Sequence, residues 1–299
     1  MAIKTAIVPV AGLGTRLLPI TQAIPKELLP LAGKPTLQYV IEELWQAGIR
    51  RTILVSSPAK SGIADYFKQG PDLERHLQET GKPELAQRLW SQSAAAAMKL
   101  ETAIQTEQLG LGHAVAVGEL LAQGEPVVVA LGDCVIDSQG SDNVLQRMIR
   151  LFDERQADIV IAFEAVSPEK VDRFGIAKPL SDDSVFELAD LVEKPSRQEA
   201  PSNLAVTARY AFSPKIFSAL RDTPRGKGNE IQLTDAIRQM IQSGASAFGV
   251  KLGTAERRFD IGNLESYTES FIHYALADPQ LRDVVNKVCR ETGSTRETH

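Results

Sequence analysis

Short apolar runs alternate with helix-type periodicity along the first part of the chain. Residues 6–10 form a nearly continuous apolar run that ends in glycines, which is typical of a strand buried on both faces of a parallel sheet. Apolar positions 37, 40, 41 and 44 then follow the spacing of an amphipathic helix. Residues 52–56 form a second apolar run. A strand, a helix and a strand in this order make a crossover unit, so the pattern predicts an α/β sheet.

The pattern changes after residue 153. Up to that residue strands and helices alternate, and beyond it β-rich segments separated by proline and glycine predominate. This change predicts a mixed sheet in the second part, and because no flexible linker separates the parts we expect them to share one sheet. Residues 69–100 are polar and helix-prone, and we expect a helical surface insertion there. The other expected strands are 102–106, 126–131, 159–165, 185–192 and 204–212, and the other expected helices are 112–121, 143–153, 230–243 and 263–277.

Composition and charge are those of an ordinary globular protein. The 33 Lys+Arg and 38 Asp+Glu give a net charge of −5, with 43% hydrophobic and 24% charged residues. This balance gives no support to nucleic acid as a partner, because such binding needs a concentrated basic face. The two cysteines are too few for a disulfide framework, so we expect a reducing compartment, the cytoplasm. Residues 1–18 contain no bilayer-length apolar run and no export signal, so we expect no membrane partner.

A glycine-rich loop follows the first expected strand directly. Gly12 and Gly14 allow backbone N–H groups to approach a phosphate closely. The loop is not a dinucleotide fingerprint, because Leu17 stands where that motif has its third glycine, and no G-K-[ST] follows. Four prolines between positions 19 and 35 also prevent a long helix from starting here. These features argue against an NAD-dependent oxidoreductase.

The extended loop carries Arg16, Lys26 and Glu27. Arginine and lysine held on a proline-stiffened loop beside a glycine turn can clamp a polyphosphate in a fixed geometry. A G-x-G taken alone more often marks a tight turn with solvated charges.

The run G-x-G-T-R-x-x-P followed by P-K-E-x-x-P-x-x-x-K-P resembles the signature of sugar-1-phosphate nucleotidyltransferases. Its A-G-L-G-T-R-x-L-P form is most similar to the bacterial members of that family that act on UTP and glucose 1-phosphate. The motifs span residues 6 to 262, most of the chain. The further family motifs, in order, are Gln105 with 110–114, then 131–133, 174–176, 192–195, 230–235 and 259–262.

The resemblance implies a Rossmann-like three-layer α/β/α fold with a mixed central sheet and a small β-rich part that binds the sugar. It places a nucleotidyltransferase domain at 1–277 and a C-terminal helix with a polar tail at 278–299. Within the domain, the expected parts are a nucleotide-binding half at 1–135, a sugar-binding half at 136–262 and the helical insertion at 69–100.

The resemblance also implies roles for single residues. Gln105 would read the uracil edge, because an amide offers both a donor and an acceptor. A side chain at Gly110 would collide with the base, and one at Gly175 with the sugar. The implied nucleotide-binding residues are Ala11, Gly12, Gly14, Thr15, Glu27, Gln105 and Gly110, and the implied sugar-binding residues are Gly175, Glu193 and Lys194. The implied catalytic cations are Arg16, Lys26 and Lys194.

Two aspartates are the expected Mg²⁺ ligands. Asp133 stands just beyond the expected strand 126–131, at the edge where open α/β sheets bind ligands. Asp260 directly follows Phe259, and both aspartates resemble the metal aspartates of the family. Hard carboxylates suit Mg²⁺. Without the resemblance, each aspartate would more simply be a turn or cap residue, because Asp forms local hydrogen bonds there.

Some neighbouring residues are assigned no chemistry. His113 is expected to cap or pack, and Thr234 and Asp235 are expected to be scaffold at a helix start. Glu193 and Lys194 adjoin at an expected strand end, so their side chains should diverge.

The resemblance implies Mg²⁺-dependent transfer of UMP from UTP to glucose 1-phosphate, which gives UDP-glucose and pyrophosphate, by a homodimer or homotetramer. One departure keeps base and sugar open. Gly132 stands where the UTP-dependent enzymes usually have proline, and this L-G-D form occurs in thymidylyltransferases and other sugar nucleotidyltransferases, so dTTP or another sugar is the alternative. A non-catalytic nucleotide-sugar-binding regulator is disfavoured, because the charged phosphate-handling residues are all present.

Overall fold

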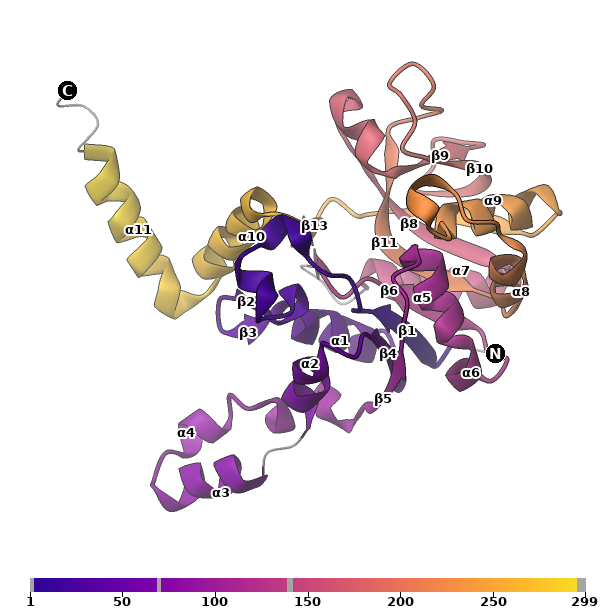
Figure 1. The fold of residues 1–299 in the computed structure, drawn as a ribbon. Coiled ribbons are helices and arrows are strands. Elements are labelled where there is room, and N and C mark those ends of the chain that lie inside the picture. The colour runs from indigo at the N-terminus through magenta and orange to yellow at the C-terminus, as the bar shows by residue number, and fades with distance from the viewer. Residues whose placement is uncertain (1–2, 69–70, 139–141, 295–299) are drawn as a thin grey trace.

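The computed structural model describes residues 3–68, 71–138 and 142–294, which fold around a nine-stranded sheet with the strand order β5-β4-β1-β6-β11-β8-β12-β10-β9 (Figure 1). Residues 204–212 and 159–165 were both expected as strands, and they form neighbouring strands in it. The strands are β1 Thr5–Pro9, β4 Arg51–Ser56, β5 Lys99–Ile104, β6 Val127–Ala130, β8 Ile159–Ala165, β9 Gly175–Pro179, β10 Val185–Glu193, β11 Leu204–Phe212 and β12 Ala247–Lys251.

The first four strands of this order are parallel, and Ile7 of β1 stands opposite Ile53 of β4 and Val129 of β6. Strand β11 then runs antiparallel to both β6 and β8, while β12 is parallel to β8. The expected mixed sheet, shared by the two parts of the chain, is therefore confirmed.

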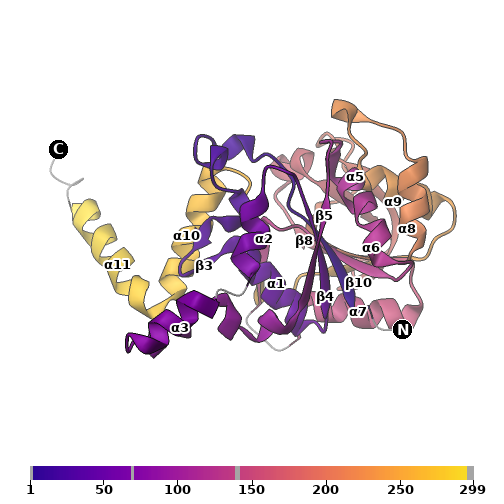
Figure 2. The same ribbon diagram turned by 60° about the horizontal axis from the view of Figure 1, so that its bottom comes forward.

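Helices cover both faces of the sheet because neighbouring residues of β1 point to opposite sides. Ala6 and Val8 pack in the same core cluster as α1 and α7, whereas Ile7 packs in the cluster of α5, α8 and α9. The two groups of helices lie on opposite sides of the sheet in Figure 2, so the expected three layers are confirmed. On the first face lie α1 Thr36–Gln46 and α7 Val144–Arg155, and on the second lie α5 Gly110–Val117, α6 Glu119–Ala122, α8 Lys215–Asp222 and α9 Leu233–Gln242.

The expected helix at 112–121 is two helices. The break falls at Gly118, where an added Cβ would lie 2.7 Å from the Ile7 side chain. In the proline-rich segment, short 3-10 turns replace a helix, as the prolines predicted: η1 Thr15–Leu17, η2 Ile20–Gln22 and η3 Lys26–Leu28.

The expected insertion is helical over its described part. It extends away from the sheet below α2 Ser61–Phe67 (Figure 1). Its first residues, 69–70, lie outside the described ranges, and its expected last residues, Lys99 and Leu100, instead begin β5. The elements are α3 Pro71–Glu79, α4 Pro83–Ala86, η4 Trp90–Gln92 and η5 Ala94–Ala97.

The C-terminal part forms α10 Leu264–Ala277 and α11 Pro279–Ser294. Helix α11 projects away from the body of the molecule in both views (Figures 1 and 2). All described side chains of 279–292 are exposed or half-exposed. The polar tail at 295–299 lies outside the described residues.

Small elements that the sequence pattern did not indicate complete the fold. Strand β7 Cys134–Ser138 pairs antiparallel with β13 Glu256–Asp260, and β2 Pro30–Leu31 pairs with β3 Lys34–Pro35. A 3-10 segment, η6 Pro168–Arg173, precedes β9. Within 3–68, 71–138 and 142–294, the helices are all too short or too polar to cross a bilayer.

Candidate active site

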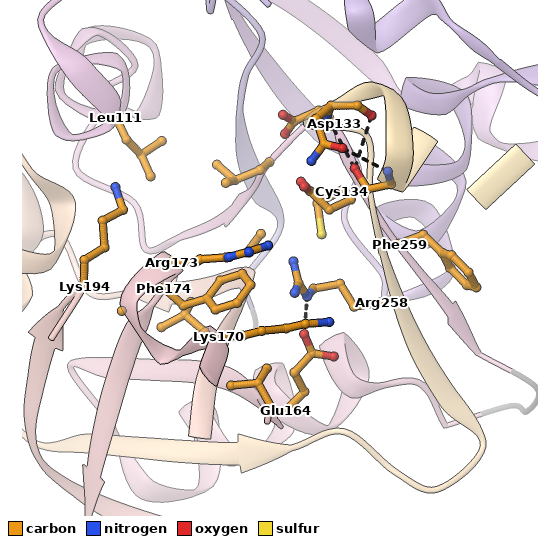
Figure 3. A pocket seen from close by; sticks show the side chains of 18 of the residues that line it. Leu111, Asp133, Cys134, Glu164, Lys170, Arg173, Phe174, Lys194, Arg258 and Phe259 are labelled. Carbon is orange, nitrogen blue, oxygen red and sulfur yellow. Dashed lines mark hydrogen bonds and ion pairs between the residues drawn. The ribbon is translucent and has the colours of Figure 1, made fainter. Parts of the chain in front are cut away.

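A cavity of about 690 Å³ opens beside the carboxyl ends of β6, β8 and β10, bordered by β13, η6 and the start of α9. Asp133 lies at one side of it and Lys194 at another, with the Lys194 ammonium reaching toward Leu111 of α5 (Figure 3). The candidate residues that line this cavity are Arg16, Asp133, Gly175, Glu193, Lys194 and Asp260.

The two aspartates come together through the small β7–β13 ribbon. Asp133 lies between β6 and β7, and Asp260 is the last residue of β13, opposite Cys134. The backbone N–H of Ile261 donates to the Asp133 carbonyl at 2.9 Å. Two acids that lie far apart in the sequence therefore become neighbours at one edge of the sheet.

A lysine ammonium lies against this acid pair. The Lys26 Nζ is 2.5 Å from Asp133 Oδ2. Burial alone would raise the pKa of Asp133, but the Lys26 charge and hydrogen bond outweigh it and hold the pKa below its ordinary value. The pKa of Asp260 is raised, first by burial and then by the Asp133 carboxylate, against the opposing charge of Arg258. The site thus holds one carboxylate stabilised by a cation and a second whose charge is disfavoured.

The glycine loop curves over the same acids. An added Cβ at Gly262, beside Asp260, would lie 3.1 Å from the Arg16 guanidinium, so Arg16 reaches the second aspartate. Gly12 faces Lys26, since its added Cβ would lie 3.9 Å from the Lys26 Nζ. Gly14 has φ 67 and its carbonyl accepts a hydrogen bond from Thr21 at 2.8 Å, which fixes the turn before Thr15 begins η1.

Glu27 is buried behind the loop, with only 1% of its surface exposed. The Lys60 ammonium donates to Glu27 Oε2 at 2.9 Å and to the Val10 carbonyl at 2.9 Å. Burial raises the pKa of Glu27 even though the Lys60 charge opposes this shift. The burial of Glu27 favours a positioning role for it over direct contact with a nucleotide. Lys60, which the sequence analysis missed, ties η3 to the end of β1.

Gln105 and Gly110 form a second group beside the glycine loop. The Gln105 amide nitrogen donates to the Gly110 carbonyl at 3.3 Å and lies 2.9 Å from His113 Nδ1. Gly110 has φ 90, and an added Cβ there would lie 2.7 Å from the Glu230 side chain, so only glycine fits. Gln108 joins this group to the loop by donating to the Ala11 carbonyl at 3.3 Å. His113, expected only to cap or pack, instead orients the Gln105 amide.

The other wall of the cavity carries Glu193 and Lys194. Their side chains were expected to diverge, but Lys194 Nζ lies 3.2 Å from Glu193 Oε1. The reason is that Lys194 has left-handed backbone, φ 45, so it does not continue the alternation of β10. Thr234, expected to be scaffold, donates to Glu193 Oε2 at 2.7 Å. Gly175 faces the same carboxylate, since its added Cβ would lie 3.4 Å from Glu193 Oε2.

Comparison with known proteins identifies the family. A family model described as nucleotidyl transferase matches residues 5–276. The chain belongs to this family. The resemblance seen in the glycine loop and the later motifs is thus confirmed, and the three-layer fold agrees with it.

Relatives of this nucleotidyltransferase carry more specific names. It is 38% identical over 292 residues to the UTP–glucose-1-phosphate uridylyltransferase of Staphylococcus haemolyticus, covering 97% of this chain and 99% of the relative. A structure described as UTP-bound UGPase from Acinetobacter baumannii has a TM-score of 0.88 and 34% identity, with 97% and 99% of the two chains covered. A UDP-glucose pyrophosphorylase complexed with UDP-glucose has a TM-score of 0.81 and 35% identity, with 92% and 100% covered.

The cavity of the nucleotidyltransferase holds further cations that the sequence analysis missed. Arg258 forms an ion pair with Glu164 of β8 and stacks over the Phe174 ring at 4.9 Å (Figure 3). Lys170 and Arg173 of η6 line the same region. Their signal in the sequence was only proximity, because Arg173 directly precedes the 174–176 motif and Arg258 stands two residues before Asp260.

The acids of the nucleotidyltransferase fit a divalent metal. Enzymes of this family generally use one. Among the described residues there is no cluster of three or more His, Cys, Asp or Glu side chains that could hold a metal ion. Mg²⁺ commonly takes one or two carboxylates and completes its shell with water and substrate phosphates. Burial and then the Asp133 carboxylate raise the pKa of Asp260, and a bound cation would favour the charged form of both acids.

Proposed function

We propose that this chain transfers UMP from UTP to glucose 1-phosphate, releasing UDP-glucose and pyrophosphate. The names of its relatives support these substrates, among them structures described with UTP and with UDP-glucose. The observation that carries the proposal is a single cavity with two walls. One wall has Arg16 and the acid pair, with Lys26 held against Asp133, and the other wall has Glu193 beside Lys194.

The first wall, together with the glycine loop and the Gln105–Gly110 group beside it, suits the nucleotide. Gln105 and Gly110 would receive the uracil, with Ala11 and Gly12 supplying backbone groups. Gly14 and Thr15 would turn the chain around the phosphates. The cations Arg16 and Lys26 would hold the β- and γ-phosphates and stabilise the charge that collects on pyrophosphate as it leaves.

The second wall suits the sugar phosphate. Glu193, fixed by Thr234, would accept hydrogen bonds from sugar hydroxyls beside Gly175. Lys194 would hold the phosphate of glucose 1-phosphate. An oxygen of that phosphate attacks the α-phosphorus of UTP, and the bond from this phosphorus to the bridging oxygen breaks as pyrophosphate departs. The attacking group is already an anion, so the protein needs to supply orientation and positive charge, not a nucleophile.

We propose that Asp133 and Asp260 hold Mg²⁺. When bound, the ion would supply positive charge that offsets the mutual repulsion of the two reactants. Lys26, whose ammonium lies 2.5 Å from Asp133 Oδ2, would share this region with the metal and would supply a second positive charge to the phosphates.

Pyrophosphate release tests the reaction. Purified protein with UTP, glucose 1-phosphate and Mg²⁺ should release pyrophosphate, and chelation of the metal should stop it. The Asp133→Asn variant should lose turnover while it still binds UDP-glucose. Unchanged turnover of this variant would show that Asp133 does not hold the metal. Binding of UDP-glucose without any turnover in the unaltered protein would instead favour a non-catalytic regulator that binds nucleotide sugars.

A substrate panel tests the base and the sugar. The Leu131-Gly132-Asp133 sequence is the observation that favours an alternative, dTTP or a different sugar 1-phosphate. UTP with glucose 1-phosphate should give the highest kcat/KM of a panel that crosses UTP and dTTP with several sugar 1-phosphates. A higher value for another pair would reassign the substrates.

We also propose a cytoplasmic homodimer or homotetramer. The reduced state expected of Cys134 and Cys289 and the exposed apolar side chains of α10 support this. Light scattering after size-exclusion chromatography gives the mass in solution, and a monomeric mass would reject the assembly.

A further inference from the structure

A buried arginine lies directly beneath the acid pair. Arg209 of β11 is fully buried, and Glu43 of α1 is its carboxylate partner. The Arg209 Nε donates to Glu43 Oε1 at 3.1 Å and its Nη2 donates to Glu43 Oε2 at 2.6 Å. This pair joins a helix of one face to the centre of the sheet, across 166 residues of sequence.

The same guanidinium holds both flanks of the turn that carries Asp133. Its Nη2 donates to the carbonyl of Cys134 at 2.8 Å, just after the aspartate. Its Nη1 donates to the carbonyl of Ala208 at 3.0 Å, and that carbonyl accepts the N–H of Leu131, just before the aspartate, at 3.2 Å. The turn is closed by the Cys134 N–H donating to the Leu131 carbonyl at 3.3 Å.

The backbone of β11 is distorted at this point. Ala208 has left-handed backbone, φ 62, although it is not glycine. The pairing of β11 with β8 shifts register between Val206 and Tyr210. Such bulges re-aim side chains near functional sites, and unfavourable backbone persists only where surrounding contacts hold it. Here the distortion turns the Ala208 carbonyl toward the Leu131–Cys134 turn.

We propose that Arg209, held in place by Glu43, is the positioning residue that fixes Asp133 for the metal and the phosphates. The inference rests on the proposed role of Asp133. A planar guanidinium with five donors can serve one carboxylate and two carbonyls at once, whereas a lysine ammonium presents three donors from one nitrogen. Arg209 touches the Asp133 turn only at backbone carbonyls, and its side chain is fully buried.

Three variants test this. Arg209→Lys keeps the charge but cannot bridge both carbonyls and Glu43. Glu43→Gln keeps the shape but removes one oxygen acceptor and the charge that orients Arg209. Arg51→Lys is the matched control, because Arg51 pairs with Glu101 between β4 and β5, away from the turn.

Two readouts separate positioning from simple stability. In Arg209→Lys, kcat should fall and the Mg²⁺ concentration for half-maximal rate should rise, each about tenfold or more, as for other residues that support a metal ligand. Hydrogen exchange of the Leu131 and Cys134 amides should accelerate relative to β6, with no substrate or metal present. Glu43→Gln should change the kinetic constants and the hydrogen exchange in the same directions as Arg209→Lys, but by less. Arg51→Lys should change neither the kinetic constants nor the exchange.

The outcomes are distinguishable. A folded Arg209→Lys protein with normal metal dependence and normal exchange at Leu131 and Cys134 overturns the proposal. If that variant does not fold, Glu43→Gln decides it by the same two criteria. Fast exchange of these two amides in the unaltered protein also overturns it, with no variant needed. If the Leu131 and Cys134 amides exchange slowly but the protein shows no turnover, the role of Arg209 in holding the Asp133 turn is kept and the proposed function is rejected.

Discussion

At the scale of single residues, one residue of the candidate site has a backbone conformation that is unfavourable for any residue with a Cβ. Lys194 has φ 45, a conformation that costs a residue with a Cβ about 1 kcal/mol or more. Nearby, Lys194 Nζ lies against Glu193, which Thr234 holds. Unfavourable backbone at a functional residue is stability given up for geometry.

Replacing Lys194 should separate its two properties. Lys194→Gly relieves the backbone and Lys194→Met does not, while both remove the ammonium. We expect both variants to lose turnover, and the glycine variant to be more stable than the methionine variant by about 1 kcal/mol. Urea unfolding and pyrophosphate release measure these two effects. Equal stability of the two variants would contradict a backbone penalty at this residue.

Gly132 is a second residue of the site, and packing explains why it is a glycine. An added Cβ there would lie 2.6 Å from Val10 Cγ1, so this chain has no room for a side chain before Asp133. Gly132→Ala should cost about 1–3 kcal/mol by overpacking. In Val10→Ala the clashing methyl is absent, so the double variant should be more stable than the sum of the two single effects. Simple additivity in urea unfolding would argue that Val10 is not the obstacle.

At the scale of elements, buried ion pairs hold the loops of the site. The Glu27–Lys60 pair fixes η3, and with it Lys26, against the end of β1. The Arg209–Glu43 pair fixes the turn between β6 and β7, and with it Asp133. Lys26 and Asp133 meet at 2.5 Å, so each half of their contact has its own internal support.

Lys60→Met should leave the Glu27 carboxylate buried without its cation, at a cost of about 3–5 kcal/mol near neutral pH. Burial already raises the pKa of Glu27, and loss of Lys60 raises it further. A carboxyl whose pKa is higher in the folded than in the unfolded protein binds its proton more readily when folded, so the variant gains stability as the pH falls.

The difference in Tm between wild type and Lys60→Met should therefore narrow from about pH 8 to about pH 5. The double variant Glu27→Gln with Lys60→Met is the control. Its side chain at position 27 is neutral, so residue 27 should add no pH dependence to the Tm of this variant. A gap that widens on acidification would contradict the assignment.

The elements also mark how far sequence reasoning reaches. Strand β8 could be predicted because its run is almost wholly apolar and buried. Strand β13, Glu256–Asp260, has one apolar residue, and only its pairing with β7 makes it a strand. Motifs predicted Asp133 and Asp260 singly, but this ribbon brings them together. Lys60 and Arg209 gave no signal, because their partners lie 33 and 166 residues away.

At the scale of the whole molecule, the C-terminal segment is an appendage. None of the described side chains of 279–292 is buried, whereas α10 packs Tyr274 against Tyr39 of α1 at 4.7 Å. Deleting residues 279–299 should therefore leave turnover per chain and the urea midpoint unchanged. Deletion from Leu264 onward should lower the midpoint, because it removes the buried Ser270 and Ala275. Loss of turnover in the shorter deletion would show that α11 contributes to the site.

The sheet carries both reactant walls on one hydrogen-bonded floor. Strands β6 and β11 pair from Arg209 opposite Ala130 to Phe212 opposite Val127. The sheet is therefore continuous between the two sides of the cavity. A hinge rotation of one side of the cavity relative to the other would have to break the hydrogen bonds between β6 and β11. We therefore expect any movement on substrate binding to be confined to surface segments such as η6, while the sheet keeps its shape. The radius of gyration from small-angle X-ray scattering should accordingly be the same with and without UDP-glucose.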